Sequence, residues 1–293
     1  PSRKHLEATA SNLKGVDNID YWGHFPVIDM KASVKGIPLK LGLRAFSPFI
    51  LGDADNSNIP AALFEIRLYN DSKDPLNGRL AFSFPGHLPP DIAKTNKVKA
   101  DKFRYDFLDG RYKGIAVTGP RDSGYALMVK NEKTDKLRFL DHSLGGPDYP
   151  WSKMLRLRLS ATKEKGRAGT ISQTGTADTG VSVVLNYNLA PGKSRSFRFA
   201  LSWFYPYFKD SGGEPHKHHY CRLYGNARQI ARQSLVHFDR LLGQTLSWQS
   251  NIYKTKDYPD WLKDGLVNSL YSLAKNSLWV VSDRPDNWYL KDP

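Results

Sequence analysis

The chain has 293 residues, of which 40% are hydrophobic and 25% are charged, as is ordinary for a soluble globular protein. Its net charge of +14 suits a polyanionic partner, but no helix-turn-helix, RNP-like aromatic run or phosphate-binding loop accompanies that charge, so nucleic acid is not an expected partner. Cys221 is the only cysteine, which excludes an intrachain disulfide and a zinc site built on several cysteines.

Residues 1–20 are polar and weakly patterned, and predict an irregular lead-in. From Phe25 to about Phe204, short alternations of apolar and polar residues are separated by Gly, Pro, Asn and Asp, which is the pattern of strands and turns. The predicted strands are 37–46, 62–69, 79–84, 114–118, 126–129, 155–160, 181–187 and 196–203. Many short strands with little helix between them favour an antiparallel β-sandwich over a parallel α/β sheet.

Part of the positive charge is concentrated in one region of the sequence. Residues 93–167 contain 18 Lys and Arg but only 9 Asp and Glu. In the segment 154–159, leucines alternate with arginines at a period of two, as in a half-buried strand with its arginines facing water. The excess therefore indicates solvated strand faces and loops, while a patch for anionic lipid or nucleic acid is the competing interpretation.

The periodicity changes after Tyr220. From about Asn226 to Trp248, apolar residues recur at helical spacing and predict a linker helix. Pro259 suits the first turn of a second helix, whose apolar stripe runs from Trp261 to Leu273, and the apolar segment 278–281 continues beyond it. This stripe needs a partner, yet the sequence stops shortly afterwards. The pattern predicts the first helix of an all-helical domain that lies outside this chain.

Several segments occur in an order that resembles one family. They are Arg44 to Ile66, Ala-Phe-Ser-Phe-Pro-Gly at 81–86, Leu-Ser-Trp-Phe-Tyr-Pro at 201–206, His-Tyr-Cys-Arg-Leu-Tyr-Gly-Asn-Ala at 219–227, Leu-Ser-Trp-Gln-Ser at 246–250 and Pro-Asp-Trp-Leu-Lys at 259–263. Together they resemble the glycoside hydrolases of family 116, which include bacterial β-glucosidases and non-lysosomal glucosylceramidases. The similarity extends over roughly residues 21–282.

The resemblance implies a mainly β fold. An antiparallel β-sandwich over residues 1–215 and a linker helix over 216–256 would precede the beginning of an (α/α)₆ barrel over 257–293. In this family the barrel supplies the nucleophilic glutamate and the acid/base aspartate of a retaining mechanism. No catalytic residue, cofactor site or metal site is therefore carried over to this chain, and whether the chain is itself an enzyme stays open.

The expected function is that of a non-catalytic sandwich that scaffolds its own C-terminal catalytic barrel. The full-length protein would act on β-glucosides or glucosylceramide-like substrates. The alternative is a stand-alone β-sandwich module that binds glycans or polyanions. No apolar run approaches the roughly 18 residues of a membrane-spanning helix, and no leader is visible. A cytoplasmic protein and an exported protein whose signal peptide is missing both remain open.

Three carboxylates in the signature segment are candidates for acid/base chemistry, namely Asp53, Asp55 and Glu65. Retaining glycosidases need two such groups about 5 Å apart. The run from Asp53 to Asn58 is more typical of a turn, because Asp and Asn side chains accept hydrogen bonds from nearby backbone groups. Arg44 and Glu65 are expected to form an ion pair that fixes this turn.

Two further groups of residues could bind ligands. His216, His218 and Cys221 form the one His/Cys cluster, but adjacency does not supply ligand geometry, so a polar linker is the preferred interpretation. Six aromatic residues could stack on sugar rings or pack in the core, namely Trp151, Trp203, Tyr205, Tyr207, Trp248 and Trp279. The aromatic segment 203–208 is the predicted contact surface for the barrel.

Overall fold

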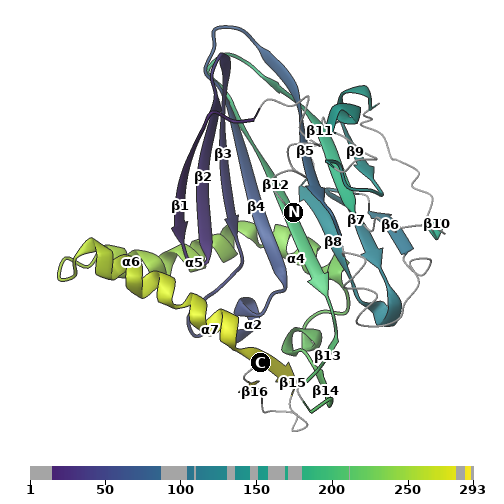
Figure 1. The fold of residues 1–293 in the computed structure, drawn as a ribbon, viewed down its shortest axis with the longest axis vertical. Helices are drawn as coiled ribbons and strands as arrows, with labels where there is room; N and C mark the ends of the chain where they lie inside the picture. Colours follow the sequence, from purple (N-terminus) through teal and green to yellow (C-terminus); the bar gives the residue numbers. More distant parts are fainter. Residues whose placement is uncertain are drawn as a thin grey trace.

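The computed structural model describes residues 15–86, 104–108, 110–130, 136–145, 151–157, 169–170, 180–210, 212–281 and 288–291. The fold is mainly β, with antiparallel sheets followed by C-terminal helices, which confirms the predicted fold class (Figure 1). Among the described residues, no helix is long and apolar enough to cross a membrane.

A nine-stranded antiparallel sheet forms the body of the molecule. In spatial order its strands are β1 (Asn18–His24), β2 (Val27–Val34), β3 (Ile37–Phe46), β4 (Ala61–Asn70), β12 (Ser194–Phe204), β8 (Gly124–Lys130), β7 (Tyr112–Thr118), β6 (Arg104–Leu108) and β10 (Gly169–Thr170). A second sheet contains β5 (Leu76–Phe84), β11 (Val181–Leu189) and β9 (Leu137–Leu140). Two hairpins pair β13 (Tyr207–Lys209) with β14 (Pro215–Lys217), and β15 (Leu278–Val281) with β16 (Trp288–Lys291).

The two sheets enclose one hydrophobic core. Phe199 on β12 is fully buried, and its ring stacks on Phe82 of β5 with centroids 5.1 Å apart. Tyr125 on β8 is also buried, with its ring 4.9 Å from that of Phe84. Burying a large apolar side chain contributes about 1.5–3 kcal/mol. This sandwich core is therefore the main source of stability for the strands.

The opposite face of the large sheet is covered at one end by two helices, α4 (Ala227–Val236) and α5 (Phe238–Tyr253). Ile230 and Phe238 are buried there, and the Phe238 ring lies edge-on to Phe46 at 5.3 Å. Figure 1 shows both helices lying across this end of the sheet. The second hydrophobic core thus fixes the helices to the strands.

The predicted linker helix is two helices rather than one. The side chain of Asn226 caps α4 by accepting a hydrogen bond from the backbone N–H of Gln229 at 2.9 Å. His237 then leaves helical geometry, with φ −99° and ψ 15°, and separates α4 from α5. The predicted second helix is likewise divided into α6 (Asp260–Ser269) and α7 (Tyr271–Asn276). Residues 278–281 form strand β15, which suits their β-branched and aromatic side chains.

Two predictions about strands were wrong. Residues 18–20 belong to β1, because an edge strand whose residues are nearly all exposed carries no alternation of wet and dry faces; residues 1–14 lie outside the described part. Leu155 and Arg156 belong to a 3₁₀ helix, Trp151–Arg156, instead of a strand. There Met154 and Leu157, three residues apart, both pack against the cluster around Leu140. Residues 158–160 lie outside the described part.

Candidate functional site

The signature segment forms the predicted turn. Asp53 precedes the short helix α2 (Ala54–Ser57), and its carboxylate accepts hydrogen bonds from the backbone and side-chain amides of Asn56 at 3.0 and 2.6 Å. Asp55, two residues later, accepts a hydrogen bond at 2.9 Å from Nε2 of His219, which is 3% exposed. His219 precedes the linker helices, so this bond ties the turn to the end of the sandwich.

The predicted ion pair between Arg44 and Glu65 was wrong. The two residues lie opposite one another on β3 and β4, but each binds another partner. Arg44 binds both carboxylate oxygens of Asp29 on β2, at 2.7 and 2.8 Å. Glu65 accepts a hydrogen bond from Nε of Arg198 on β12 at 2.8 Å. Adjacent strands therefore supply the partners, and the turn is not involved.

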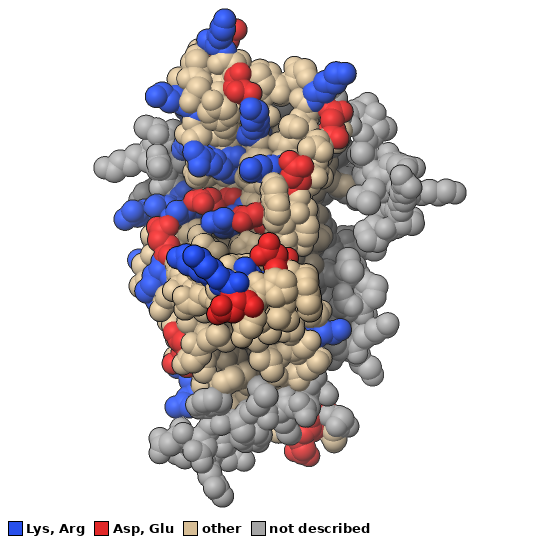
Figure 2. All heavy atoms as spheres, turned by 90° about the vertical axis from the view of Figure 1, so that its left-hand side faces the viewer, with Lys and Arg blue, Asp and Glu red and all other residues tan. Residues whose placement is uncertain are grey.

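These groups belong to one row across the sheet. In cross-strand register, Asp29, Arg44, Glu65 and Arg198 follow one another on β2, β3, β4 and β12. Asp239 of α5 ends the row with a bidentate contact to Arg198 at 2.8 Å. Signs alternate along the row, so each charge faces opposite charges. Figure 2 shows acidic and basic side chains interleaved on the side of the molecule where β1 and α6 lie.

The ion pairs of this row shift the pKa values of Asp29 and Asp239. Burial by itself raises the pKa of Asp29, but hydrogen bonds from Arg44 and His24 outweigh it, and the pKa is lowered. The hydrogen bond from Arg198 lowers the pKa of Asp239. Asp29 and Asp239 are thus held in their charged forms. A general acid requires the opposite, a carboxyl group kept protonated, so these carboxylates resemble structural ion pairs.

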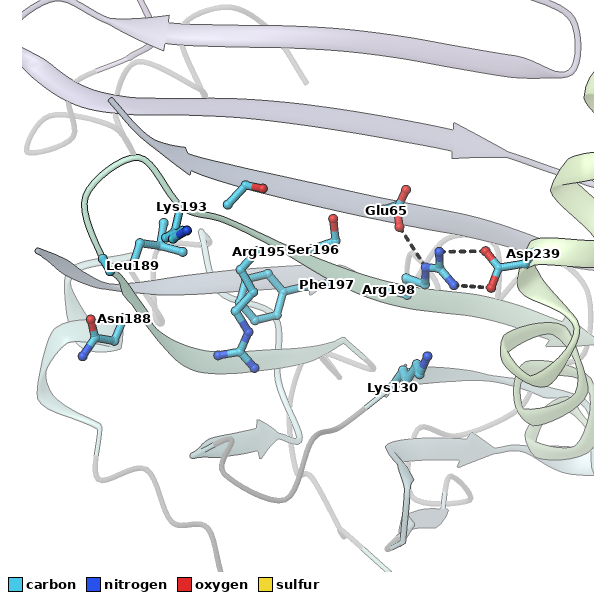
Figure 3. A pocket seen from close by; sticks show the side chains of 12 residues that line it. Glu65, Lys130, Asn188, Leu189, Lys193, Arg195, Ser196, Phe197, Arg198 and Asp239 are labelled. Atoms are coloured by element: carbon cyan, nitrogen blue, oxygen red, sulfur yellow. Dashed lines mark hydrogen bonds and ion pairs between the residues drawn. The ribbon is translucent and has the colours of Figure 1, made fainter. Parts of the chain in front are cut away.

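A cleft of about 700 Å³ borders this row along β12. Its ionisable lining residues are Glu65, Lys130, Lys193, Arg195, Arg198 and Asp239. Figure 3 shows the Arg198 guanidinium between Glu65 and Asp239, with Lys130 and Arg195 outside this clamp. Four cations face two carboxylates, so the cleft carries an excess of positive charge. Arg198 binds both carboxylates, so the excess positive charge of the cleft comes from Lys130, Lys193 and Arg195.

The residues of the His/Cys segment contact different partners and do not converge on one site. Nε2 of His216 lies 2.9 Å from Asp210, whereas the His218 ring stacks on Tyr220 at 5.1 Å. The Cys221 thiol donates a weak hydrogen bond to the Pro206 carbonyl at 3.8 Å, and burial raises its pKa to about 11. Within the described ranges, no three His, Cys, Asp or Glu side chains are arranged to hold a metal ion.

The six predicted aromatic candidates differ in exposure. Trp248 is only 8% exposed, and its indole N–H donates to the carbonyl of Phe49 at 2.8 Å, so it belongs to the core. Trp151, Tyr205 and Trp279 are half-buried, whereas Trp203 and Tyr207 are exposed. Within segment 203–208 the Phe204 side chain is buried, so only part of that segment can serve as a contact surface.

The sequence prediction missed a groove between β1 and the helices. Its volume is about 630 Å³, and it is lined by Trp22 of β1, by Leu246, Ser250, Tyr253 and Lys254 of α5, and by Asp264 of α6. Trp22 was missed because its segment carried no strand periodicity. The adjacent aromatic pair Tyr21-Trp22 in a polar stretch was the one available signal.

A family model and a solved structure are similar to this chain. Residues 1–241 match the family described as "beta-glucosidase 2, glycosyl-hydrolase family 116 N-term". Among solved structures, the chain is similar to one titled "Putative kojibiose phosphorylase from human microbiome", with 13% sequence identity and a TM-score of 0.42. That similarity covers 86% of this chain but 27% of the other, so the chain spans about a quarter of that protein. The family match covers more than half of the chain, and the chain therefore belongs to glycosyl-hydrolase family 116 as an N-terminal domain.

Proposed function

We propose that this chain is the non-catalytic N-terminal part of a retaining β-glucosidase or glucosylceramidase-like hydrolase, and that it scaffolds a helical catalytic barrel. Family membership supports the substrate class. We place the sandwich at residues 1–215, the linker at 216–256 and the beginning of the barrel at 257–293. The catalytic glutamate and aspartate belong, in this proposal, to the barrel.

The outward side of α6 and α7 is the observation that carries the proposal. Val267 is the one buried residue of α6, and α7 has none. Large apolar side chains are exposed instead: Trp261 by 73% and Leu273 by 53%. Several large apolar side chains exposed on two consecutive helices are typical of an interface. A helical barrel would bury these side chains among its own helices.

The inward side of the same helices is fixed to the sandwich. Asn268 of α6 accepts a hydrogen bond from the backbone N–H of Phe25 at 2.9 Å, and the Phe25 ring lies 6.2 Å from that of Tyr271. Gln249 of α5 donates to the carbonyls of His24 and Phe25 at 3.0 and 2.9 Å. The turn between β1 and β2 therefore holds α5 and α6 in place. Such a rigid platform suits a scaffold for the barrel.

Three experiments test the proposal. The reading frame after codon 293 is expected to continue into a long helical segment with separate Glu and Asp motifs, and a stop codon there would contradict the proposal. That segment, expressed separately, should bind the purified chain. Replacing Trp261 and Leu273 by serine should weaken binding by about tenfold or more, whereas serine at exposed Ile37, the first residue of β3, should not. Glucose release from a β-glucoside by the purified chain alone would overturn the non-catalytic role.

A further inference from the structure

The groove between β1 and the two helices has an aromatic wall. Trp22 lies on the edge strand and is 49% exposed, although it lines the groove. The ammonium group of Lys31, on the neighbouring strand, lies 5.2 Å from the centre of the Trp22 ring. This cation–π contact restrains the ring. Leu246 of α5 adds apolar surface, so the groove presents a restrained apolar platform.

Polar groups from α5 and α6 surround this platform. Burial and a hydrogen bond to Asp264 raise the pKa of Tyr253 to about 12, so its hydroxyl keeps its proton and donates to that carboxylate. Ser250 and Lys254 also line the groove. They bring a hydroxyl and an ammonium group beside the carboxylate. The groove thus offers hydrogen-bond donors and acceptors together with one charge of each sign.

Two further residues that line the groove, His24 and Gln249, make hydrogen bonds within the protein. Gln249, 2% exposed, uses its amide nitrogen on the carbonyls of His24 and Phe25, and its oxygen lies 2.8 Å from Nδ1 of His24. Nε2 of His24 lies 3.3 Å from Asp29. Because these side chains hold the strand against the helix, the groove is formed in advance of any ligand. A site that needs no rearrangement binds at lower entropic cost.

We propose that this groove binds the pyranose ring of a neutral saccharide. A flat aromatic face flanked by a few polar groups suits a ring with an apolar C–H face and a rim of hydroxyls. The opposite charges of Asp264 and Lys254 give the groove no preference for an ionic ligand, and the polar rim disfavours a purely apolar one. This site goes beyond the scaffolding role proposed above, because it needs no contact with a catalytic domain.

Titration of the purified chain with cellobiose tests the site, followed by calorimetry and tryptophan fluorescence. Saturable binding is expected, and Trp22→Ala should weaken it about tenfold or more, as for other aromatic anchors. Trp203→Ala removes another exposed tryptophan, from β12, and should change the affinity by less than about twofold. Absence of saturable cellobiose binding, or equal affinity of the Trp22→Ala variant, would overturn the proposal.

Asp264→Asn is a second variant that keeps the aromatic wall intact. It should weaken cellobiose binding while leaving the thermal unfolding midpoint close to wild type, and unchanged affinity would count against the site. Sodium sulfate serves as the anionic probe. Competition between sulfate and cellobiose for the groove would show an anion site and reject the neutral saccharide. Since every measurement uses this chain alone, failure here leaves the scaffolding proposal to its own tests.

Discussion

Replacing Arg198 with methionine tests the charged row at its most connected member. The guanidinium binds Glu65 and Asp239, and it lies 4.5 Å from the centre of the Phe238 ring. Phe238 is 1% exposed and belongs to the core between sheet and helices. Methionine keeps much of the apolar stem but removes every polar contact. The variant therefore measures what the charge itself contributes.

The contacts of Arg198 differ in their expected contributions. The Glu65 side chain is 24% exposed, and a hydrogen bond to such a charged group contributes about 1.5–3 kcal/mol. The Asp239 side chain is 79% exposed, which limits its pair to at most about 0.5 kcal/mol. The contact with Phe238 adds about 0.5–1 kcal/mol. Because methionine recovers part of the packing, we expect Arg198→Met to lower the free energy of unfolding by about 2–3 kcal/mol.

Equilibrium urea unfolding measures this loss. The control is Arg67→Met, in the next row, where an exposed guanidinium donates to Ser194 at 3.0 Å; it should cost less than about 0.5 kcal/mol. Glu65→Gln, combined with Arg198→Met, completes a double-mutant cycle with an expected coupling of about 1–2 kcal/mol. A cost for Arg198→Met no larger than the control, or a coupling near zero, would refute the assigned role of the row.

Three further changes have defined outcomes. The Tyr220 hydroxyl donates to the backbone carbonyl of Tyr205 at 2.6 Å and accepts from the backbone N–H of Tyr205 at 3.0 Å. Tyr220→Phe removes both hydrogen bonds, so the free energy of unfolding should fall by about 1–3 kcal/mol in a urea titration. The pKa of Asp29 is lowered from 3.8, so its ion pairs stabilise the fold at pH values above 3.8. This stabilisation is lost as the pH falls through the lowered pKa. Between about pH 5 and pH 2, the thermal unfolding midpoint of Asp29→Asn should therefore fall less than that of the wild type. A Cβ added at Gly243 in α5 meets no atom within 4 Å, so Gly243→Ala should raise the free energy of unfolding by about 0.5–1 kcal/mol. A Cβ added at Gly124 would collide with the backbone of the neighbouring strand and should lower the free energy of unfolding.

The strands that the sequence predicted bury apolar residues, β8 on both faces and part of β4 on one face only. On the second half of β4, Ile66 and Leu68 are buried while Arg67 between them is exposed, and this contrast is visible as alternation. On β1 the residues are exposed on both faces, so no alternation exists to detect. Strand prediction therefore failed at the edge of the sheet. The saccharide groove now proposed lies at that edge.

The charged row could not be predicted, because its members come from four strands and one helix. The sequence suggested the neighbours Arg44 and Glu65 correctly as residues on adjacent strands, but assigned them the wrong bond. Hydrogen-bond partners depend on register, and each residue of a sheet has a neighbour on both sides. Only the complete strand order shows that Asp29 and Arg198 flank this pair.

The hydrogen bonds around His24 join the sheet to the helices. The amide nitrogen of Gln249 must face the two backbone carbonyls that it binds, so its oxygen faces Nδ1 of His24 and can only accept. The carboxylate of Asp29, near Nε2, can also only accept. Nδ1 of His24 therefore lies beside an acceptor on α5, and Nε2 lies beside an acceptor on β2. Because Asp29 also binds Arg44, side-chain contacts connect the charged row through His24 and Gln249 to α5. The helix that supports the apolar platform is thus anchored by the same charges that cross the sheet.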